Sequence, residues 1–422
     1  MSKIILIDWP GTRELDPDEH EKLKREKIID YFDGFSFKDY EKFFQLCLEI
    51  KEILSHDNKG YQLEVGIKDV LMVLADKDHD LYREVLDYYL RLGNPFDLNT
   101  IPLIGSLIKI CGAQYTFGVL SKLEYPRIRT LLFSYYYSLP PSEITNENLN
   151  GLYNFYRKAE FGEIPRDLDF LLKYRSLDDD AVIKVVEIVL DKVKEDPSYA
   201  FPLSMLFNPY SEVNEAIIEL FVGNIDLLER AYFAAQKIEK YLDHDGRSFA
   251  RILERDPNFI LKYVDLMCEG KEWSDRYDDT RDYAFIWLRN DGEDLMVRVA
   301  ERIYEAERKH GPFIATYLKT FFILQKDGIC EDIRTKQDRF LKRLIEIRCS
   351  EPDFMNFIFG LITLFSPEKR RQFIAVFLEC NKNFEIFQRL PLEPNSWGWS
   401  GSVSADPNLT PHADPILTPY IN

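Results

Sequence analysis

The sequence predicts an all-α protein in which antiparallel pairs of helices stack on one another. Apolar residues recur with the period of a helix over most of the 422 residues, and one helix–proline–helix junction occurs three times. A two-helix unit of this kind cannot bury its apolar face alone, so successive units are expected to stack. A minor extended segment at the N-terminus and an irregular C-terminal tail complete the prediction.

The elements follow in order along the chain. Residues Ile4 to Ile7 are expected to form one short strand, which Trp9-Pro10-Gly11 ends. The helical period begins after residue 16, and its clearest stripe has Lys51 as the one polar member. The three most regular stripes are Tyr40, Phe43, Phe44, Cys47, Leu48, Lys51 and Leu54; Ile67, Val70, Leu71 and Leu74; and Leu81, Val85, Tyr88, Tyr89 and Leu92. Gly93-Asn94-Pro95 is expected to end a helix and Ser366-Pro367 to begin one.

The recurring junction consists of an acidic residue, a proline, any residue and an aromatic residue. It reads Asp196-Pro197-Ser198-Tyr199, Asp256-Pro257-Asn258-Phe259 and Glu351-Pro352-Asp353-Phe354, with apolar residues at matching positions on both sides. We expect the acid to cap the second helix, the proline to occupy its first turn, and the aromatic residue to open its buried face. The spacings of 60 and 95 residues fit no single period, so either the repeats are irregular or some junctions lack the proline.

Through these stripes and junctions, residues 17–390 resemble α-solenoids of the HEAT or TPR type. The Trp-Leu-Gly-Tyr consensus of TPR proteins is not present. The region also looks like the helical regions appended to bacterial signalling NTPases of the STAND type, whose solenoids bind ligands that trigger the ATPase. No diagnostic motif accompanies either resemblance. The first implies a stack of helix pairs, and the second implies the sensor arm of a multidomain NTPase, for example in phage defence.

The predicted organisation has an N-terminal extended segment at 1–16, a helical-repeat domain at 17–390 and an irregular tail at 391–422. Proline- and charge-rich connections suggest internal joints near 138–166 and 269–284. The tail contains six prolines and neither Lys nor Arg, which predicts irregular structure. Because the change in composition is abrupt, we expect a truncated or non-native terminus there.

Composition narrows the function. The net charge of −18 opposes binding to nucleic acids and anionic membranes, which depends on clustered Lys and Arg. The most apolar stretch, Phe354 to Phe365, contains Asn356 and is too short to span a membrane, and the N-terminal apolar run is too short for a signal peptide. The six cysteines lie far apart without metal-ligand spacing, so reduced thiols in a cytoplasmic protein are expected.

Two groups of residues are candidates for a binding surface. The first is aromatic and could stack on bases or bind a peptide, whereas buried helix packing is its alternative. The second is basic and could bind phosphate, whereas interspersed acids also fit a salt-bridged outer face. The aromatic group is Tyr135, Tyr136, Tyr137, Tyr153, Phe155 and Tyr156, and the basic group is Arg339, Lys342, Arg343, Lys369, Arg370 and Arg371. Three consecutive tyrosines cannot all face one way on a helix, so one or two should be exposed.

Asp243-His244-Asp245-Gly246 is the tightest His/Asp cluster, and the acidic stretch Asp275 to Asp282 lies further along the chain. Together they raise the hypothesis of a metal-dependent hydrolase, since carboxylates and imidazole bind divalent ions. The alternative for Asp243 to Gly246 is an exposed turn in which Asp caps a helix and Asp245-Gly246 reverses the chain. The alternative for the acidic stretch is a solvated loop or helix start.

The sequence therefore favours a non-enzymatic recognition or scaffold protein that binds a protein partner, with a basic partner favoured by charge. No metal and no cofactor is expected, and the oligomeric state stays open. The NTPase sensor arm and the metal-dependent hydrolase remain as alternatives.

Overall fold

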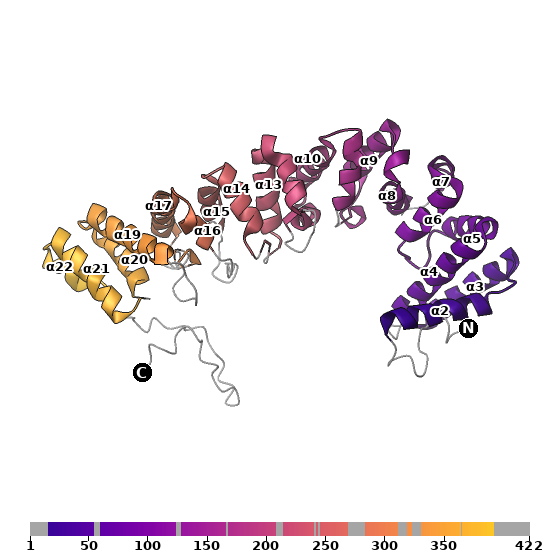
Figure 1. Ribbon diagram of the computed structural model, residues 1–422, viewed down its shortest axis with the longest axis horizontal. Helices are drawn as coiled ribbons and strands as arrows, with labels where there is room; N and C mark the ends of the chain where they lie inside the picture. The colour runs from indigo at the N-terminus through magenta and orange to yellow at the C-terminus, as the bar shows by residue number, and fades with distance from the viewer. Residues whose placement is uncertain are drawn as a thin grey trace, which may run out of the picture. The chain divides into compact units, whose positions relative to one another are not determined.

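Every element that the computed structural model describes is helical, and no strand occurs among the described residues (Figure 1). The described residues are 16–54, 60–123, 128–165, 168–207, 214–239, 242–243, 245–268, 283–310, 318, 320–322, 331–363 and 365–391. The all-α prediction is confirmed. The expected N-terminal strand and the C-terminal tail lie outside these residues, apart from Pro391. No helix among them is long and apolar enough to cross a membrane.

The chain divides into two compact units, Met1–Pro202 and Leu203–Asn422, between the two joints expected near 138–166 and 269–284. The first unit contains α2 (Pro17–Tyr31), α3 (Phe37–Leu54), α4 (Gly60–Lys77), α5 (His79–Arg91), α6 (Ile101–Cys111), α7 (Ala113–Leu120), α8 (Ile128–Ser138), α9 (Asn146–Lys158), η4 (Asp169–Ser176), α10 (Ala181–Val193) and η5 (Pro197–Ala200). Each α-helix packs on its neighbours one or two places along the chain, as α4 does on α2, α3, α5 and α6.

The second unit contains α12 (Asn214–Leu220), η7 (Phe221–Gly223), α13 (Ile225–Gln236), α14 (Arg247–Arg255), α15 (Phe259–Cys268), α16 (Ala284–Leu288), α17 (Gly292–His310), α19 (Glu331–Arg348), α20 (Pro352–Ile362), α21 (Pro367–Cys380) and α22 (Phe384–Arg389). Helices α13, α15, α17, α19 and α21 pack successively on one another and form one row. Helix α14 packs on α13 and α15, α16 on α17 and α19, and α20 on α19 and α22. This arrangement of packed helix pairs is consistent with a helical-repeat fold.

The first two predicted stripes lie largely in the core. Tyr40, Phe43, Phe44 and Cys47 are buried, as are all four members of the second stripe. Lys51, the polar member of the first stripe, donates a hydrogen bond to the Pro95 carbonyl (2.6 Å) and lies over the Phe96 ring.

The prediction of the third stripe, on α5, is wrong in part. Val85 and Tyr89 are buried, but so are Tyr82 and Leu86, whereas Leu92 is exposed at the end of α5. The buried face of α5 is therefore rotated from the predicted one, because α4 and α6 both pack against this helix.

The three junctions differ in how the acid is used. Asp196 accepts a hydrogen bond from the backbone N–H of Ser198 (2.9 Å) at the start of η5, as capping predicts. Asp256 accepts one from the N–H of Asn258 (2.8 Å), but this bond closes the turn before α15 and does not cap the helix itself. Glu351 makes no such bond and instead pairs with Arg348 (2.5 Å), so the predicted cap is wrong there. The proline lies in the first turn of η5 and α20 but in a turn before α15. At Ser366 the predicted cap is confirmed by a bond from the N–H of Lys369 (3.3 Å).

Several lysine side chains donate hydrogen bonds to backbone carbonyl groups at the C-terminal ends of neighbouring helices. The last carbonyls of a helix lack partners within it, and a cation there is also favoured by the helix dipole. Three lysines donate in this way: Lys173 to Leu139 (2.8 Å), Lys192 to Ala159 (2.9 Å) and Lys336 to Trp287 (2.9 Å). Each of these bonds joins residues at least 33 positions apart and therefore couples one helix to another. Lys51 donates instead to Pro95 in the loop after α5.

Ion pairs connect successive helices of the row in the second unit, each with the acid on the earlier helix and the base on the later one. The pairs are Glu229–Lys262, Asp265–Arg302 and Glu293–Arg339 (2.5 Å each), together with Asp294–Arg343 and Asp338–Lys369. An exposed pair contributes only about 0.2–1 kcal/mol, so their combined effect is mainly to fix the register of parallel neighbours.

We predict that Gly151→Ala destabilises the first unit, because a methyl group there would lie 2.3 Å from the Tyr136 hydroxyl and close to its buried ring. Overpacking of this kind costs about 1–3 kcal/mol. The measurement is the urea midpoint by far-UV circular dichroism. Gly118→Ala is the control, since nothing lies within 4 Å of its added methyl group and Ala favours helix. Equal midpoints for Gly151→Ala and the wild-type protein would contradict the prediction.

Candidate functional site

The aromatic candidates form a packed cluster. Five of the six are buried, namely Tyr135, Tyr136, Tyr153, Phe155 and Tyr156, and Tyr137 is partly exposed. The expectation that one or two of the consecutive tyrosines face outward is met only in part, by Tyr137, which still contacts the Phe170 ring. Burial between α8, α9 and η4 makes these rings core residues, as the packing alternative predicted. A binding role for them is not supported by this placement.

Hydrogen bonds fix the cluster from within. The Tyr174 hydroxyl donates to the Tyr136 carbonyl (2.7 Å), and the Tyr153 hydroxyl donates to Asp178 (2.8 Å). Lys173 also donates to the Tyr137 carbonyl, and its ammonium group lies over three rings. Burial lowers the pKa of Lys173 to about 8 and raises the pKa of Tyr136 to about 12. The cluster therefore closes the end of α8, and Tyr137 is the partly exposed member among the six candidates.

The basic candidates lie on the neighbouring helices α19 and α21. Three of the six pair with acids, namely Arg339 with Glu293, Arg343 with Asp294 and Lys369 with Asp338. Lys342 and Arg371 are exposed, and Arg371 donates from Nε to the Pro367 carbonyl (3.3 Å). Arg370 is partly exposed. This distribution agrees with the alternative interpretation, a salt-bridged outer face. Phosphate binding by these residues remains a prediction.

Asp243 caps the start of α14. Its carboxylate accepts hydrogen bonds from the backbone N–H groups of Ser248 (3.0 Å) and Phe249 (2.7 Å) and from the Tyr232 hydroxyl (3.3 Å). The left-handed Gly246 (φ 73°) reverses the chain, so the capping turn is confirmed. The turn is not exposed at its start, however, because only 1% of Asp243 is accessible to solvent. Its carboxylate therefore serves the helix start and faces away from solvent.

The remaining residues of the hydrolase hypothesis, His244 and Asp275 to Asp282, lie outside the described residues. Within the described part of the chain, no group of three or more His, Cys, Asp or Glu residues is arranged to hold a metal ion.

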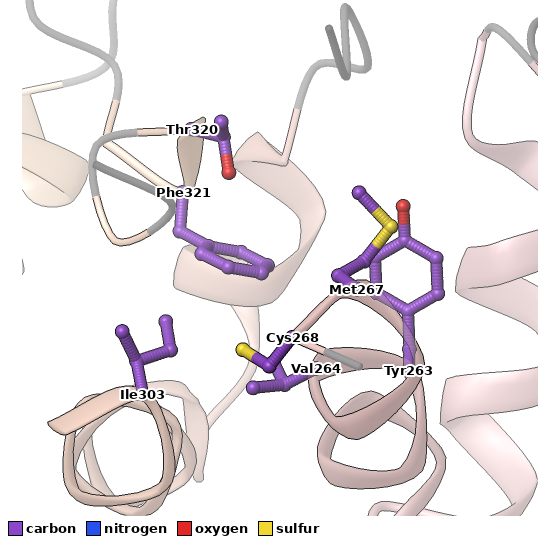
Figure 2. Close-up of a pocket in the computed structure, with 7 residues that line it drawn as sticks. All are labelled: Tyr263, Val264, Met267, Cys268, Ile303, Thr320 and Phe321. Atoms are coloured by element: carbon purple, nitrogen blue, oxygen red, sulfur yellow. The ribbon is translucent and has the colours of Figure 1, made fainter. Parts of the chain in front are cut away.

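A small apolar pocket lies between α15 and α17 in the second unit (Figure 2). Its lining residues are Tyr263, Val264, Met267, Cys268, Ile303, Thr320 and Phe321. In the close-up, the Phe321 ring lies over the space between Ile303 and Cys268. Thr320 and the Tyr263 hydroxyl contribute the oxygen atoms drawn, and the lining is otherwise carbon and sulfur. We interpret this pocket as a packing gap in the core.

A buried carboxyl group occupies the interface of α13 and α15. Glu229 is 2% exposed, and one of its oxygens accepts from Lys262 (2.5 Å), which also donates to Asp256 (2.9 Å). Burial raises the pKa of Glu229 to about 7. Burial opposes ionisation of Asp256 as well, but hydrogen bonds from Lys262 and the Asn258 N–H prevail and lower its pKa.

Helix α20 offers a narrow accessible strip that sequence analysis did not identify. The strip consists of Asp353, Asn356, Gly360 and Thr363, spaced three, four and three residues apart, and so lies along one face of the helix. Most of the other residues of α20 are buried. No atom of the described residues lies within 4 Å of where a Cβ atom at Gly360 would stand. The sequence does contain a signal for this strip. Asn356 and Gly360 interrupt the apolar stretch Phe354 to Phe365 at helical spacing.

The polar atoms of the α20 strip differ in their hydrogen bonding. The Asn356 Oδ1 atom is buried and lacks a hydrogen-bond partner among the described residues, whereas the Thr363 hydroxyl donates to the Gly360 carbonyl (2.8 Å). A mid-helix glycine costs about 0.5–1 kcal/mol relative to Ala. No described side chain fills the space at Gly360, so packing within the described chain does not account for that cost.

Comparison of the chain with protein-family models, with curated proteins and with solved structures finds no match. The resemblance to STAND-type sensor arms therefore has no family match behind it, and the helical-repeat character stands on the packed helix pairs alone.

We predict that Asp243→Ala lowers the free energy of unfolding by about 1–3 kcal/mol, because two buried N–H groups lose an acceptor. Asp245→Ala is the control, since Asp245 is partly exposed and its bond to the Arg247 N–H is longer (3.2 Å). The measurement is the denaturant midpoint of each variant, and equal losses in both would contradict the capping role.

We predict that ionisation of Glu229 lowers the free energy of unfolding as the pH rises from about 4.5 to 7. Its raised pKa means that the folded state holds this proton more tightly than the unfolded chain, so raising the pH through this window favours unfolding. Glu229→Gln should reduce the loss by about 1–3 kcal/mol. Urea unfolding at pH 5 and pH 7.5 measures it. The idea fails if both proteins lose the same stability.

Proposed function

We propose that the protein is a non-enzymatic recognition protein and that the α20 strip takes part in contacting a protein partner. The observation that carries this proposal is the open space at Gly360 on a helix whose other faces are largely buried. Small residues let the backbone of a partner approach closely, and Gly360 leaves such a space on the α20 strip. Stacked helix pairs commonly present surfaces of this kind.

The charge of the chain favours a particular class of partner. A net charge of −18 attracts positively charged proteins and speeds their encounter, especially at low ionic strength. Asp353 places a carboxylate at the start of the α20 strip, where it is exposed. We therefore expect a basic protein segment that places a positive charge near Asp353 and a small or flat surface against Gly360.

The larger exposed apolar side chains support the choice of the α20 strip indirectly, because they are scattered over the chain. Val222, Leu288 and Ile347 are 55%, 56% and 62% exposed, but they belong to separate elements. Single exposed apolar residues are normal on protein surfaces and need no partner. The α20 strip is different because its four accessible residues lie on one helix face and are all small or polar.

We predict that Gly360→Arg reduces capture of the partner by at least about tenfold, the equivalent of 1.4 kcal/mol. The added side chain would enter the open space, since its Cβ atom meets no described neighbour within 4 Å. The experiment is affinity purification of the tagged full chain from its native host, followed by quantitative mass spectrometry and circular dichroism of each variant.

The matched control is Gly118→Arg, which adds the same side chain at another helical glycine with nothing within 4 Å. A specific partner should be retained by the control and lost with Gly360→Arg. Retention by both variants, or loss from both, would overturn the assignment to the α20 strip.

A further inference from the structure

Helices α19 and α21 run side by side in a register that two contacts define. Asp338, in the middle of α19, pairs with Lys369 near the start of α21. Near the ends of the two helices, the Asn381 side chain donates from Nδ2 to the Cys349 carbonyl (2.6 Å). The second half of α19 therefore runs parallel to α21.

This register brings two cysteines together. Cys349 follows Asp338 by the same number of residues as Cys380 follows Lys369, so each cysteine lies about three helical turns beyond its end of the ion pair. The thiol of Cys380 contacts the side chain of Cys349. Cys380 is exposed and Cys349 partly exposed, whereas Cys47 and Cys268 are buried.

We propose that Cys349 and Cys380 form a reversible disulfide, making this pair a thiol-oxidation site whose co-substrate is a low-molecular-weight disulfide. The proposal does not depend on the α20 strip. In a reducing compartment the pair would remain a dithiol, and oxidation would tie the end of α19 to the end of α21.

The chemistry proceeds in two exchanges. A thiolate of the pair attacks the small disulfide, whose sulfur–sulfur bond breaks, and one small thiolate leaves. The second protein thiolate then attacks the mixed disulfide, forms the Cys349–Cys380 bond and releases the second small thiolate. Two electrons pass to the small disulfide, and the two thiol protons end on its two products or in the solvent.

The surroundings of Cys380 slow the first step at neutral pH. Burial, the neighbouring Cys349 and the carboxylates of Glu346 and Glu379 all raise the pKa of this thiol. Fewer thiolates form as a result, so the resting pair is expected to be reduced and the reaction to quicken at mildly alkaline pH.

The test uses the reduced full chain incubated with oxidised glutathione at about pH 8, near the ordinary thiol pKa. Samples are blocked with a thiol alkylating reagent, digested with trypsin without reduction and measured by mass spectrometry. Trypsin is expected to separate the two cysteines into peptides 349–369 and 372–382, each with one cysteine. A disulfide-linked pair of these peptides is the expected product.

Single variants make the result decisive. Cys349→Ser and Cys380→Ser remove the second thiol, so each should accumulate a glutathione adduct on the remaining cysteine at least about tenfold above the wild-type protein, where the intramolecular thiol displaces it. Stable adducts on both cysteines of the wild-type protein would overturn the proposal, as would complete alkylation of both with no linked peptide. Circular dichroism of each variant verifies that the fold is retained.

Discussion

The structure depends on the packing of each helix against neighbours one or two places along the chain. Such a helix has no distant partner that could cover its apolar stripe, so the next units must do so. In the second unit this produces the row of α13, α15, α17, α19 and α21, in which each helix is bounded by the one before and the one after. The register between parallel neighbours then becomes the critical quantity, because a slip would expose apolar surface at every step.

Charged side chains contribute to that register in two ways. Acid on the earlier helix and base on the later one define a direction along the row, as in Glu293–Arg339. Lysines such as Lys192 and Lys336 close the ends of neighbouring helices by donating to their last carbonyls. Individually these contacts are weak, but each has one correct geometry. Much of the abundant charge of the sequence is therefore structural, which reduces the number of residues available for binding.

The proposed α20 strip and the Cys349–Cys380 pair both follow from this packing. Helix α20 is covered on most of its surface, so only one narrow face remains accessible, and that face contains small and polar residues. The two cysteines meet because α19 and α21 share a register fixed by Asp338 and Lys369. Neither feature is a conventional sequence motif. Both arise where regular packing leaves specific atoms exposed or adjacent.

The sequence by itself determined the helical class, the first two stripes, the capping serine at Ser366 and the acid cap at Asp196, because each depends on local spacing and backbone chemistry. Only the tertiary structure decided which aromatic residues are buried, which face of α5 is covered, and that Glu351 pairs with Arg348 instead of capping. It also decided that Gly360 faces open space. The physical reason is that periodicity defines a stripe on one helix, whereas burial depends on which neighbours cover that stripe and at what register.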